Sequence, residues 1–465
     1  MKKGEVVENI EITGVSADGR AVGKKDGIVV FLTGAAPGDR VSAKILGRRK
    51  RLLTGQVTNY EVLSPDRVDP FCEHFGTCGG CKWQHLSYDA QLAHKEAHVT
   101  DNLRKLSGMD LPEFRPILGS DSQRFYRNKL EYTFSNRRWL TKEEIGSGDD
   151  LETSGLGFHI PGMFDKVLDI SKCHLQSEPS NDIRLAVKDY AIQHGLSFYD
   201  IRQHGGLLRN LIIRTTSIGQ VMVIVQFGHR DSEAINGLLK HLRDTFPTIT
   251  SLNFIINEKK NDSFYDLAVE LFDGSPYIEE KMEELTFRIG PKSFYQTNSA
   301  QAHELYKIVR EFAGFAGNEV VYDLYTGTGT IANFVAKHVD KVIGIESVPE
   351  AVEDAKVNAS INGIENTTFH AGDMKDLLSG TFVEQHGRPD VVITDPPRAG
   401  MHKNVVECLL QVRPQKIVYV SCNPATQARD MELLGAAYDA TAVQPVDMFP
   451  HTHHVENVVL LELRK

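Results

Sequence analysis

The chain has 465 residues, of which 41% are hydrophobic and 25% charged, a composition typical of an ordinary globular protein. This length exceeds what one hydrophobic core usually serves, so two or three domains are expected. No apolar run approaches the about 18 residues of a membrane helix, and the N-terminus has no signal-peptide core. We therefore expect a soluble, cytoplasmic protein with no membrane contact and no obligate protein partner.

The net charge of −10 hides a basic N-terminal segment. Residues 1–60 carry eleven Lys and Arg against six Asp and Glu, and the excess peaks in "GRRKRLL" (47–53). A positively charged N-terminal segment on an otherwise acidic protein favours a role in binding phosphate groups. A merely solvated run of charges is the alternative.

The first sixty residues consist of short runs in which apolar and polar positions alternate. Turn signals such as "ADGR", "KKDG" and "GAAPGD" separate these runs. The pattern predicts a small OB-like β-barrel over residues 1–62, of the kind that binds oligonucleotides on one face.

A cluster of three cysteines follows this segment. Cys72, Cys78 and Cys81 form a C-x5-C-x2-C run, with Gly79 and Gly80 allowing the chain to fold around a ligand. In a chain with only six cysteines, such crowding favours a metal site over a disulfide framework.

The fourth ligand of this site must come from elsewhere in the chain. Cys173 is the spare cysteine outside the expected core. A zinc site using Cys173, His74 or His85 and an iron–sulfur cluster held by four cysteines both remain open.

Residues 63–290 are predicted to form a central α+β domain. Residues 87–106 suit a helix, and residues 124–290 mix strand-like with helical runs. The polar, glycine-bearing stretch 141–155 is interpreted as a loop insertion.

Residues 291–465 alternate strands with helices. Nearly continuous Val and Ile strands indicate burial on both faces, and hence an α/β doubly wound parallel sheet. Ligands of such sheets bind beyond the carboxyl ends of the strands. Five chemically active residues fall at or just past predicted strand ends and locate an active site: Asp323, Glu346, Asp373, Asp395 and Cys422.

A glycine-rich turn follows the first of these strands in "DLYTGTGT" (323–330). Gly327 and Gly329 let backbone N–H groups approach a ligand, and Glu346 at the next strand end is placed to bind ribose hydroxyls. The D-x-x-x-G-x-G spacing resembles class I S-adenosylmethionine methyltransferases. In that class "AGD" (371–373) matches the adenine contact, and "DPPRAG" (395–400) follows the fourth strand.

Cys422, in "VYVSCNPAT" (418–426), is the candidate nucleophile. C5 of a pyrimidine is a poor nucleophile, but addition of a thiolate at C6 makes C5 able to attack an activated methyl group. A base must then remove the C5 proton, and Glu456, at the start of the last predicted strand, suits that role. The competing interpretation is a small buried residue, which we assign to Cys408.

Three histidines lie shortly before Glu456, at positions 451, 453 and 454. Such a cluster is typical of a metal site, but hydrogen bonds from these histidines to RNA or to the backbone would account for their presence as well.

The chain resembles the bacterial RNA 5-methyluridine methyltransferases, in the ribosomal (23S rRNA) branch with an N-terminal TRAM domain. The matching motifs are the cysteine cluster with Cys173, "SFYQTN" (293–298), "DLYTGTGT", "DPPRAG", "SCNPAT" and "PHTHHVE", and they extend over almost the whole chain. The resemblance implies a TRAM fold for residues 1–62 and a Rossmann-like methyltransferase domain over residues 291–465. It also allows residues 87–121 to pack with that catalytic domain.

The resemblance also implies roles for individual residues. It implies Cys422 as nucleophile, Glu456 as proton acceptor, and Arg127 and Lys129 as RNA contacts. The S-adenosylmethionine contacts that the resemblance implies are Gln296, Tyr325, Thr330, Glu346, Asp373 and Asp395. The 4Fe–4S ligands that it implies are Cys72, Cys78, Cys81 and Cys173.

The expected function is methylation of C5 of a specific uridine in 23S rRNA, with the uridine swung out of its stack. One alternative is the same chemistry on tRNA, whose enzymes generally lack the barrel and the cysteine cluster. Another is a non-catalytic RNA-binding or ribosome assembly factor, against which the intact Cys422 and Glu456 argue.

Overall fold

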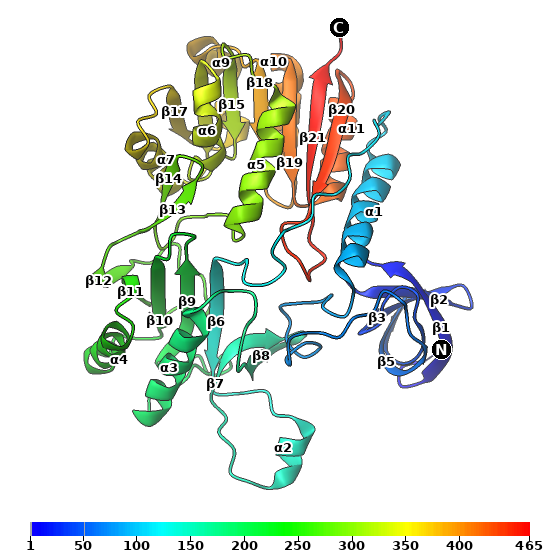
Figure 1. Cartoon of the computed structure of the whole chain (residues 1–465), viewed down its shortest axis with the longest axis vertical. Helices are drawn as coiled ribbons and strands as arrows, with labels where there is room; N and C mark the ends of the chain where they lie inside the picture. Colours follow the sequence, from blue (N-terminus) through cyan, green and yellow to red (C-terminus); the bar gives the residue numbers. More distant parts are fainter. Residues whose placement is uncertain (1, 51) are drawn as a thin grey trace.

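A computed structural model describes residues 2–50 and 52–465. Arg51, part of the basic stretch 47–53, lies outside the described residues. The chain forms an N-terminal barrel, a central sheet and a C-terminal sheet (Figure 1).

The N-terminal barrel is closed by five strands in the order β1-β2-β3-β5-β4, with β4 pairing back onto β1. Alternate residues such as Ile10 and Ile12 point inward, which explains the alternation seen in the sequence. The predicted small barrel is therefore confirmed. Its strands are β1 (Val6–Val15), β2 (Ala21–Lys25), β3 (Ile28–Thr33), β4 (Arg40–Arg49) and β5 (Leu52–Val62).

Helix α1 (Tyr88–Leu106) begins at Ser87, whose side chain accepts a hydrogen bond from the Ala90 N–H group. Its buried residues Val99 and Leu103 join the core of the C-terminal sheet. The helix therefore packs against elements much later in the chain, α11 and β20 (Figure 1).

The central sheet has seven strands in the order β12-β11-β10-β9-β6-β7-β8. Its strands are β6 (Lys129–Ser135), β7 (Gly155–Ile160), β8 (Met163–Asp169), β9 (Leu208–Thr215), β10 (Val221–Phe227), β11 (Ile249–Ile256) and β12 (Glu270–Gly274). Helices α3 (Ser180–Gln193) and α4 (Ser232–Thr245) pack on one face.

The insertion 141–155 is not all loop, since it contains the short helix α2 (Lys142–Ser147). Thr141 and Glu144 cap this helix reciprocally, a local signal that its polar composition obscured.

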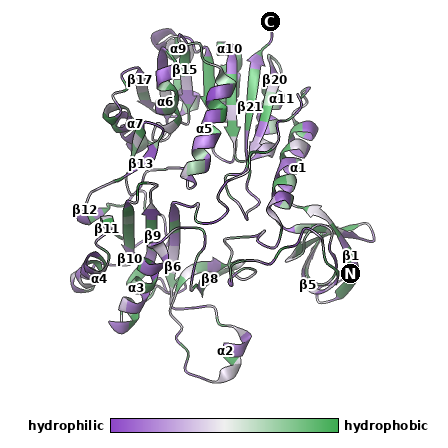
Figure 2. Ribbon diagram, viewed as in Figure 1, coloured by the Kyte–Doolittle hydropathy of each residue, from purple (hydrophilic) through white to green (hydrophobic). Residues whose placement is uncertain are grey.

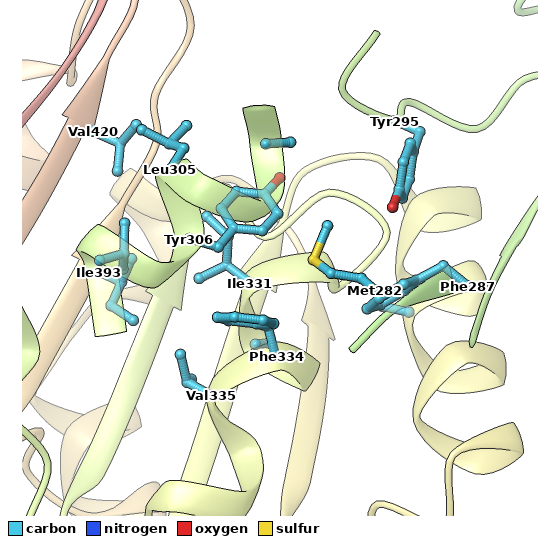
Figure 3. Close-up of a cluster of buried hydrophobic side chains, with 14 of the residues drawn as sticks. Met282, Phe287, Tyr295, Leu305, Tyr306, Ile331, Phe334, Val335, Ile393 and Val420 are labelled. Atoms are coloured by element: carbon cyan, nitrogen blue, oxygen red, sulfur yellow. The ribbon is translucent and has the colours of Figure 1, made fainter. Parts of the chain in front are cut away.

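The other face of the central sheet meets the hairpin β13 (Ile278–Met282) and β14 (Leu285–Ile289) and helix α5 (Ser299–Ala313). Their apolar side chains continue into the C-terminal sheet as one cluster. Figure 3 shows Tyr306 and Phe334 at its centre, with Ile393 and Val420 from the sheet beside them.

The C-terminal sheet has the order β17-β16-β15-β18-β19-β21-β20. Its first five strands are parallel, as predicted, and the last strand in the chain, β21, is antiparallel to both neighbours. The strands are β15 (Val320–Leu324), β16 (Lys341–Glu346), β17 (Thr367–Ala371), β18 (Val391–Thr394), β19 (Lys416–Ser421), β20 (Tyr438–Val446) and β21 (Glu456–Leu463).

Helices cover both faces of this sheet. On one face, with α5, lie α6 (Thr330–Val335), the 3-10 turn η1 (Ala336–His338) and α7 (Pro349–Ile361). On the other, with α1, lie α8 (Met374–Leu377), α9 (Gly380–His386), α10 (Lys403–Val412) and α11 (Pro424–Leu434).

In Figure 2, strands such as β10 and β21 are largely green, and helices such as α1 and α5 carry both purple and green residues. Within residues 2–50 and 52–465, no helix combines the length and the apolar character that crossing a membrane requires.

Candidate active site

The predicted nucleophile and base meet at the carboxyl edge of the C-terminal sheet. Ser421, the last residue of β19, pairs with Asn457 of β21. Cys422 directly follows β19 and Glu456 begins β21, so the same register, continued by one residue, sets them side by side. The antiparallel direction of β21 is what brings its first residue to this edge.

Asp395 and Asp323 lie at the same edge of the sheet. Asp395 directly follows β18, which pairs with both β15 and β19. Asp323 lies one residue before the end of β15. Its Oδ2 accepts from the Thr326 hydroxyl at 2.5 Å and from the Ala332 N–H group at 3.1 Å, which fixes the glycine-rich turn.

That turn needs unusual backbone conformations. Tyr325, Gly327 and Gly329 all have positive φ, at 63°, 55° and 74°. A Cβ on Gly329 would lie 2.8 Å from Ala355 Cβ, whereas one on Gly327 would meet no atom within 4 Å. Gly329 therefore allows close packing, and Gly327 leaves space above the turn for a ligand.

Glu346 ends β16 beside the turn. Its carboxylate accepts from the N–H groups of Gly327 at 3.1 Å, Ser347 at 2.7 Å and Val348 at 3.0 Å. The two carboxylate oxygens still have acceptor capacity for a ribose diol.

The other predicted cofactor contacts have different surroundings. Gln296 lies in the segment before α5, where its carbonyl accepts from the Asn128 side chain at 2.9 Å. Thr330 is buried at the start of α6. Asp373 is half exposed, caps α8 and pairs with Lys375 at 2.9 Å, so it stands at the rim of the site.

The turn that carries Cys422 is tied to the Asp-Pro-Pro-Arg loop. The Asn423 side chain caps α11 by accepting from the Ala425 N–H group at 3.2 Å. It also donates to the carbonyl of Arg398 at 3.0 Å, and the Thr426 hydroxyl donates to the same oxygen at 3.2 Å. The two motifs quoted from the sequence thus form one structural unit.

Burial sets the protonation of this site. It raises the pKa of Cys422 to about 11, helped by the carboxylates of Glu456 and Asp395 and opposed by Arg398. Burial, with the Asp395 carboxylate, also raises the pKa of Glu456 well above its usual range. The pKa of Asp323 is raised to about 7 for the same two reasons. A cation entering this site would lower all these pKa values.

Arg398 was missed as a site residue by the sequence reasoning, although it lies within the quoted "DPPRAG" motif. Its cation is the group that opposes the rise in the pKa of both Cys422 and Glu456. The motif gave its position, but only the fold shows that it approaches the thiol.

The three histidines before Glu456 are neutral. Burial lowers the pKa of His451 and His453 to about 4 and that of His454 to about 3. His451 bonds to Gln91 of α1, and His454 Nδ1 lies 3.5 Å from the Arg398 guanidinium.

The four predicted cysteine ligands line one cavity of about 170 Å³, together with Arg127 and apolar side chains such as Leu130. Asn181 holds Cys173 by accepting from its N–H group at 2.7 Å. Burial raises the pKa of Cys78 to about 11 and that of Cys81 to about 12, and the neighbouring thiols add to the rise.

In the part of the chain that is described, no three His, Cys, Asp or Glu side chains are grouped closely enough to hold one metal ion. The two histidines considered as zinc ligands bond elsewhere, His74 to Ser171 at 3.0 Å and His85 to the Ala35 carbonyl at 3.1 Å.

The two predicted RNA contacts are both partly buried. The Arg127 guanidinium lies over the Phe449 ring, 5.2 Å from its centroid. Lys129 pairs with Glu131 at 2.5 Å, with its side chain only 16% exposed. Burial and Arg214 lower the Lys129 pKa, so a phosphate would compete for an occupied and poorly accessible ammonium.

Comparison with known proteins agrees with this chemistry. Residues 215–464 match the family described as tRNA (Uracil-5-)-methyltransferase. A relative from Bacteroides thetaiotaomicron is 57% identical over 97% of this chain and 100% of its own length. One from Porphyromonas gingivalis is 56% identical over 97% and 99%. Both are described as uncharacterized RNA methyltransferases.

A solved structure resembles almost the whole chain. It is the Pyrococcus abyssi tRNA (uracil-54, C5)-methyltransferase in complex with S-adenosyl-L-homocysteine. The TM-score is 0.75 at 28% identity, over 98% of this chain and 100% of that one. The likeness therefore includes the N-terminal barrel. The protein belongs to the RNA uracil-5 methyltransferase family, and it is an S-adenosylmethionine-dependent enzyme that methylates C5 of uracil in RNA.

Proposed function

We propose that Cys422 is the nucleophile and Glu456 the base of this methyl transfer. The supporting observation is that β19 and β21 pair in a register that sets the two residues side by side at the carboxyl edge of the C-terminal sheet. A thiol and a carboxyl group adjacent to each other are what addition and elimination at one ring require.

The proposed reaction has three steps. The Cys422 thiolate, its proton already lost to solvent, adds through Sγ to C6 of the uracil, and the C5–C6 double-bond electrons move into an enolate. C5 then attacks the sulfonium methyl group, and the breaking C–S bond leaves its electrons on the departing S-adenosylhomocysteine. Glu456 removes the C5 proton, the double bond re-forms, and the C6–S bond breaks to release the thiolate.

The protonated state of the free site suits an ordered reaction. In the free protein burial keeps the Cys422 thiol protonated at neutral pH and shifts Glu456 towards its protonated form. A bound sulfonium cation would lower both pKa values and so favour the thiolate only when the methyl donor is present. Gln296, Tyr325, Thr330, Glu346, Asp373 and Asp395 are the proposed contacts to that donor.

The four-cysteine cavity is proposed to hold a 4Fe–4S cluster on Cys72, Cys78, Cys81 and Cys173. Four cysteines, one buried and three partly buried, line a cavity of about 170 Å³, which suits a polynuclear cluster better than one zinc ion. Such a cluster would supply cross-links between distant segments. Protein purified without oxygen should be brown, and Cys81→Ser should remove the colour; colourless protein containing zinc would contradict the assignment.

The proposed RNA target is a uridine of 23S rRNA. The cysteine cavity and the motif order of the ribosomal branch support this target. The N-terminal barrel does not separate rRNA from tRNA, because the likeness to the Pyrococcus abyssi tRNA enzyme includes it. Transfer RNA is the second candidate, because the similar Pyrococcus abyssi structure is that of a tRNA (uracil-54, C5)-methyltransferase.

One experiment separates the two targets. The 5-methyluridine content of 23S rRNA and of tRNA is mapped in cells with and without the gene. Loss of a site from 23S rRNA alone supports the proposal, and loss from tRNA alone overturns it.

A further inference from the structure

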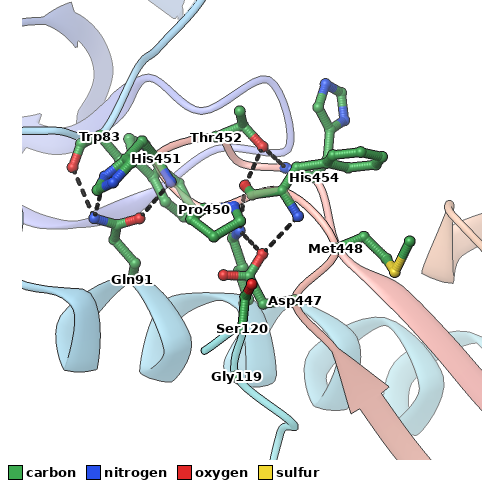
Figure 4. A network of polar contacts seen from close by, with 12 residues as sticks. Trp83, Gln91, Gly119, Ser120, Asp447, Met448, Pro450, His451, Thr452 and His454 are labelled. Atoms are coloured by element: carbon green, nitrogen blue, oxygen red, sulfur yellow. Dashed lines mark hydrogen bonds and ion pairs between the residues drawn. The ribbon is translucent and has the colours of Figure 1, made fainter. Parts of the chain in front are cut away.

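The loop between β20 and β21, residues 447–455, ends at the proposed base Glu456. We call it the base loop. Although it connects two neighbouring strands of one sheet, it is anchored by residues far away in the sequence. Figure 4 shows Gln91 of α1 and Trp83 of the cysteine-bearing segment beside it, and Tyr126 and Asn298 also bond to it.

The first anchor is a buried ion pair between the base loop and α1. Lys95 Nζ lies 2.6 Å from Asp447 Oδ1, and both side chains are 0% exposed. The Tyr88 hydroxyl donates to the other Asp447 oxygen at 2.9 Å, and Lys95 also donates to the Phe449 carbonyl at 3.1 Å.

The second anchor is Gln91, one turn before Lys95 on α1. Its Oε1 accepts from the His451 N–H group at 2.8 Å, and its Nε2 lies 3.2 Å from His451 Nδ1. The same Nε2 donates to the carbonyls of Trp83 and Leu86 at 3.1 and 2.9 Å. Gln91 thus joins the base loop to the segment that carries the cysteines (Figure 4).

Further bonds hold the residues between these anchors. Asn298 donates to the Met448 carbonyl at 3.0 Å, and the Tyr126 hydroxyl donates to the Pro450 carbonyl at 3.0 Å. His451 has a φ of 64°, a conformation that residues other than glycine rarely adopt. The surrounding bonds therefore impose one backbone path on the loop.

This arrangement specifies geometry more than it adds stability. A buried ion pair contributes little net stability, because desolvation offsets the attraction between its charges. A general base, however, must come within about 3 Å of the proton it removes. A loop held at successive residues can place the Glu456 carboxyl with that accuracy.

We infer that Gln91, together with the Lys95–Asp447 pair, positions Glu456 for removal of the C5 proton. This inference rests on the proposed role of Glu456 as base. Cys422 reaches the site from β19 and makes none of these contacts, so addition and methyl transfer do not depend on the network. Loss of the network therefore slows elimination selectively, and the covalent RNA–protein intermediate accumulates.

The test variant is Gln91→Met, which keeps the side-chain length and removes its hydrogen bonds. During turnover with RNA and S-adenosylmethionine, the denaturant-resistant RNA adduct should rise about tenfold over wild type, and kcat should fall by about 10 to 100-fold. The ratio kcat/KM for RNA should stay within about twofold, so that KM falls together with kcat, because the slowed elimination follows addition and methyl transfer.

The matched control is Val99→Ala on the same helix. Val99 is 0% exposed and contacts the core instead of the base loop, so this variant loses stability without gaining adduct. Equal adduct levels in Gln91→Met and Val99→Ala would overturn the positioning role. If Gln91→Met fails to fold, Tyr88→Phe removes one hydroxyl from Asp447 and should still raise the adduct above the Val99→Ala level; no rise would overturn the role.

Glu456→Gln serves as the reference in the same assay. If it accumulates adduct and the network variants do not, the positioning role is wrong and the base assignment stands. If Glu456→Gln itself accumulates none, the proposed base is wrong, and the inference falls with it.

Discussion

At the scale of single residues, the active site combines a thiol with carboxyl groups whose pKa values are raised by burial. Cys422, Glu456 and Asp323 all have raised pKa values, and Arg398 is the nearby cation that acts against the first two. Strand-end positions in the sequence were enough to select these acidic and thiol groups. Their protonation was not predictable, because it depends on burial and on distances between strands.

The raised thiol pKa predicts slow alkylation of Cys422 in the free enzyme. With a pKa of about 11, only about 0.1% of the thiol is ionised at pH 8, and the thiolate is the reactive form. The rate of reaction with iodoacetamide, measured at Cys422 by peptide mass spectrometry, should therefore rise about tenfold per pH unit from pH 8 to 10. A rate that levels off below pH 9 would show a thiol pKa near or below the ordinary value.

The raised Glu456 pKa predicts a pH-dependent difference in stability. The folded state binds this proton more tightly than the unfolded state, so the wild-type contribution falls as pH rises from the unfolded pKa towards the higher folded one. Glu456→Gln removes that dependence. Urea unfolding should show the variant gaining stability relative to wild type between pH 5 and 8, and a constant difference would contradict the shift.

At the scale of elements, the start of α11 holds the nucleophile turn in place. Asn423 caps the helix and also donates to the Arg398 carbonyl, so one side chain fixes both motifs. Helices and strands with clear periodicity were predictable, including the helix over 87–106. The short helix α2 and the antiparallel return of β21 were not, since they depend on a cap and on strand order.

Asn423→Ala tests this double role. Loss of the cap should lower the free energy of unfolding by about 1 kcal/mol. Loss of the bond to the loop should also lower kcat by about tenfold, because the thiol is no longer held against its partners. Asp231→Ala, which removes the cap of α4, is the control with a similar stability loss and unchanged kcat. Equal kcat values in the two variants would contradict the role.

At the scale of the whole molecule, contacts between distant segments unite three regions that the sequence presents separately. The barrel touches the cysteine-bearing segment, since Trp83 Nε1 donates to the Gly19 carbonyl at 3.0 Å. Lys95 meets Asp447 across 352 residues of chain. The barrel and the parallel sheet were predictable from local alternation. These contacts were not, because no local pattern records which distant polar groups meet.

Because the N-terminal barrel carries exposed basic residues, we expect part of the affinity for RNA to depend on the salt concentration. Lys44 and Arg49 are exposed on β4, and their replacement by Gln should weaken RNA binding most at low salt. The slope of log K against log salt concentration should shrink by about 0.7 to 0.9 per lost phosphate contact. Lys240→Gln on α4 is the control. An unchanged slope in the double variant would show that this strand does not meet the phosphates.

The central claim is a transient bond between Cys422 and C6 of uracil. Its most direct test is the rate of methyl transfer from labelled S-adenosylmethionine to RNA by purified Cys422→Ala, with folding checked by circular dichroism. The account predicts no methylated uridine and no covalent RNA complex from a folded variant. Methylation at the wild-type rate would contradict it.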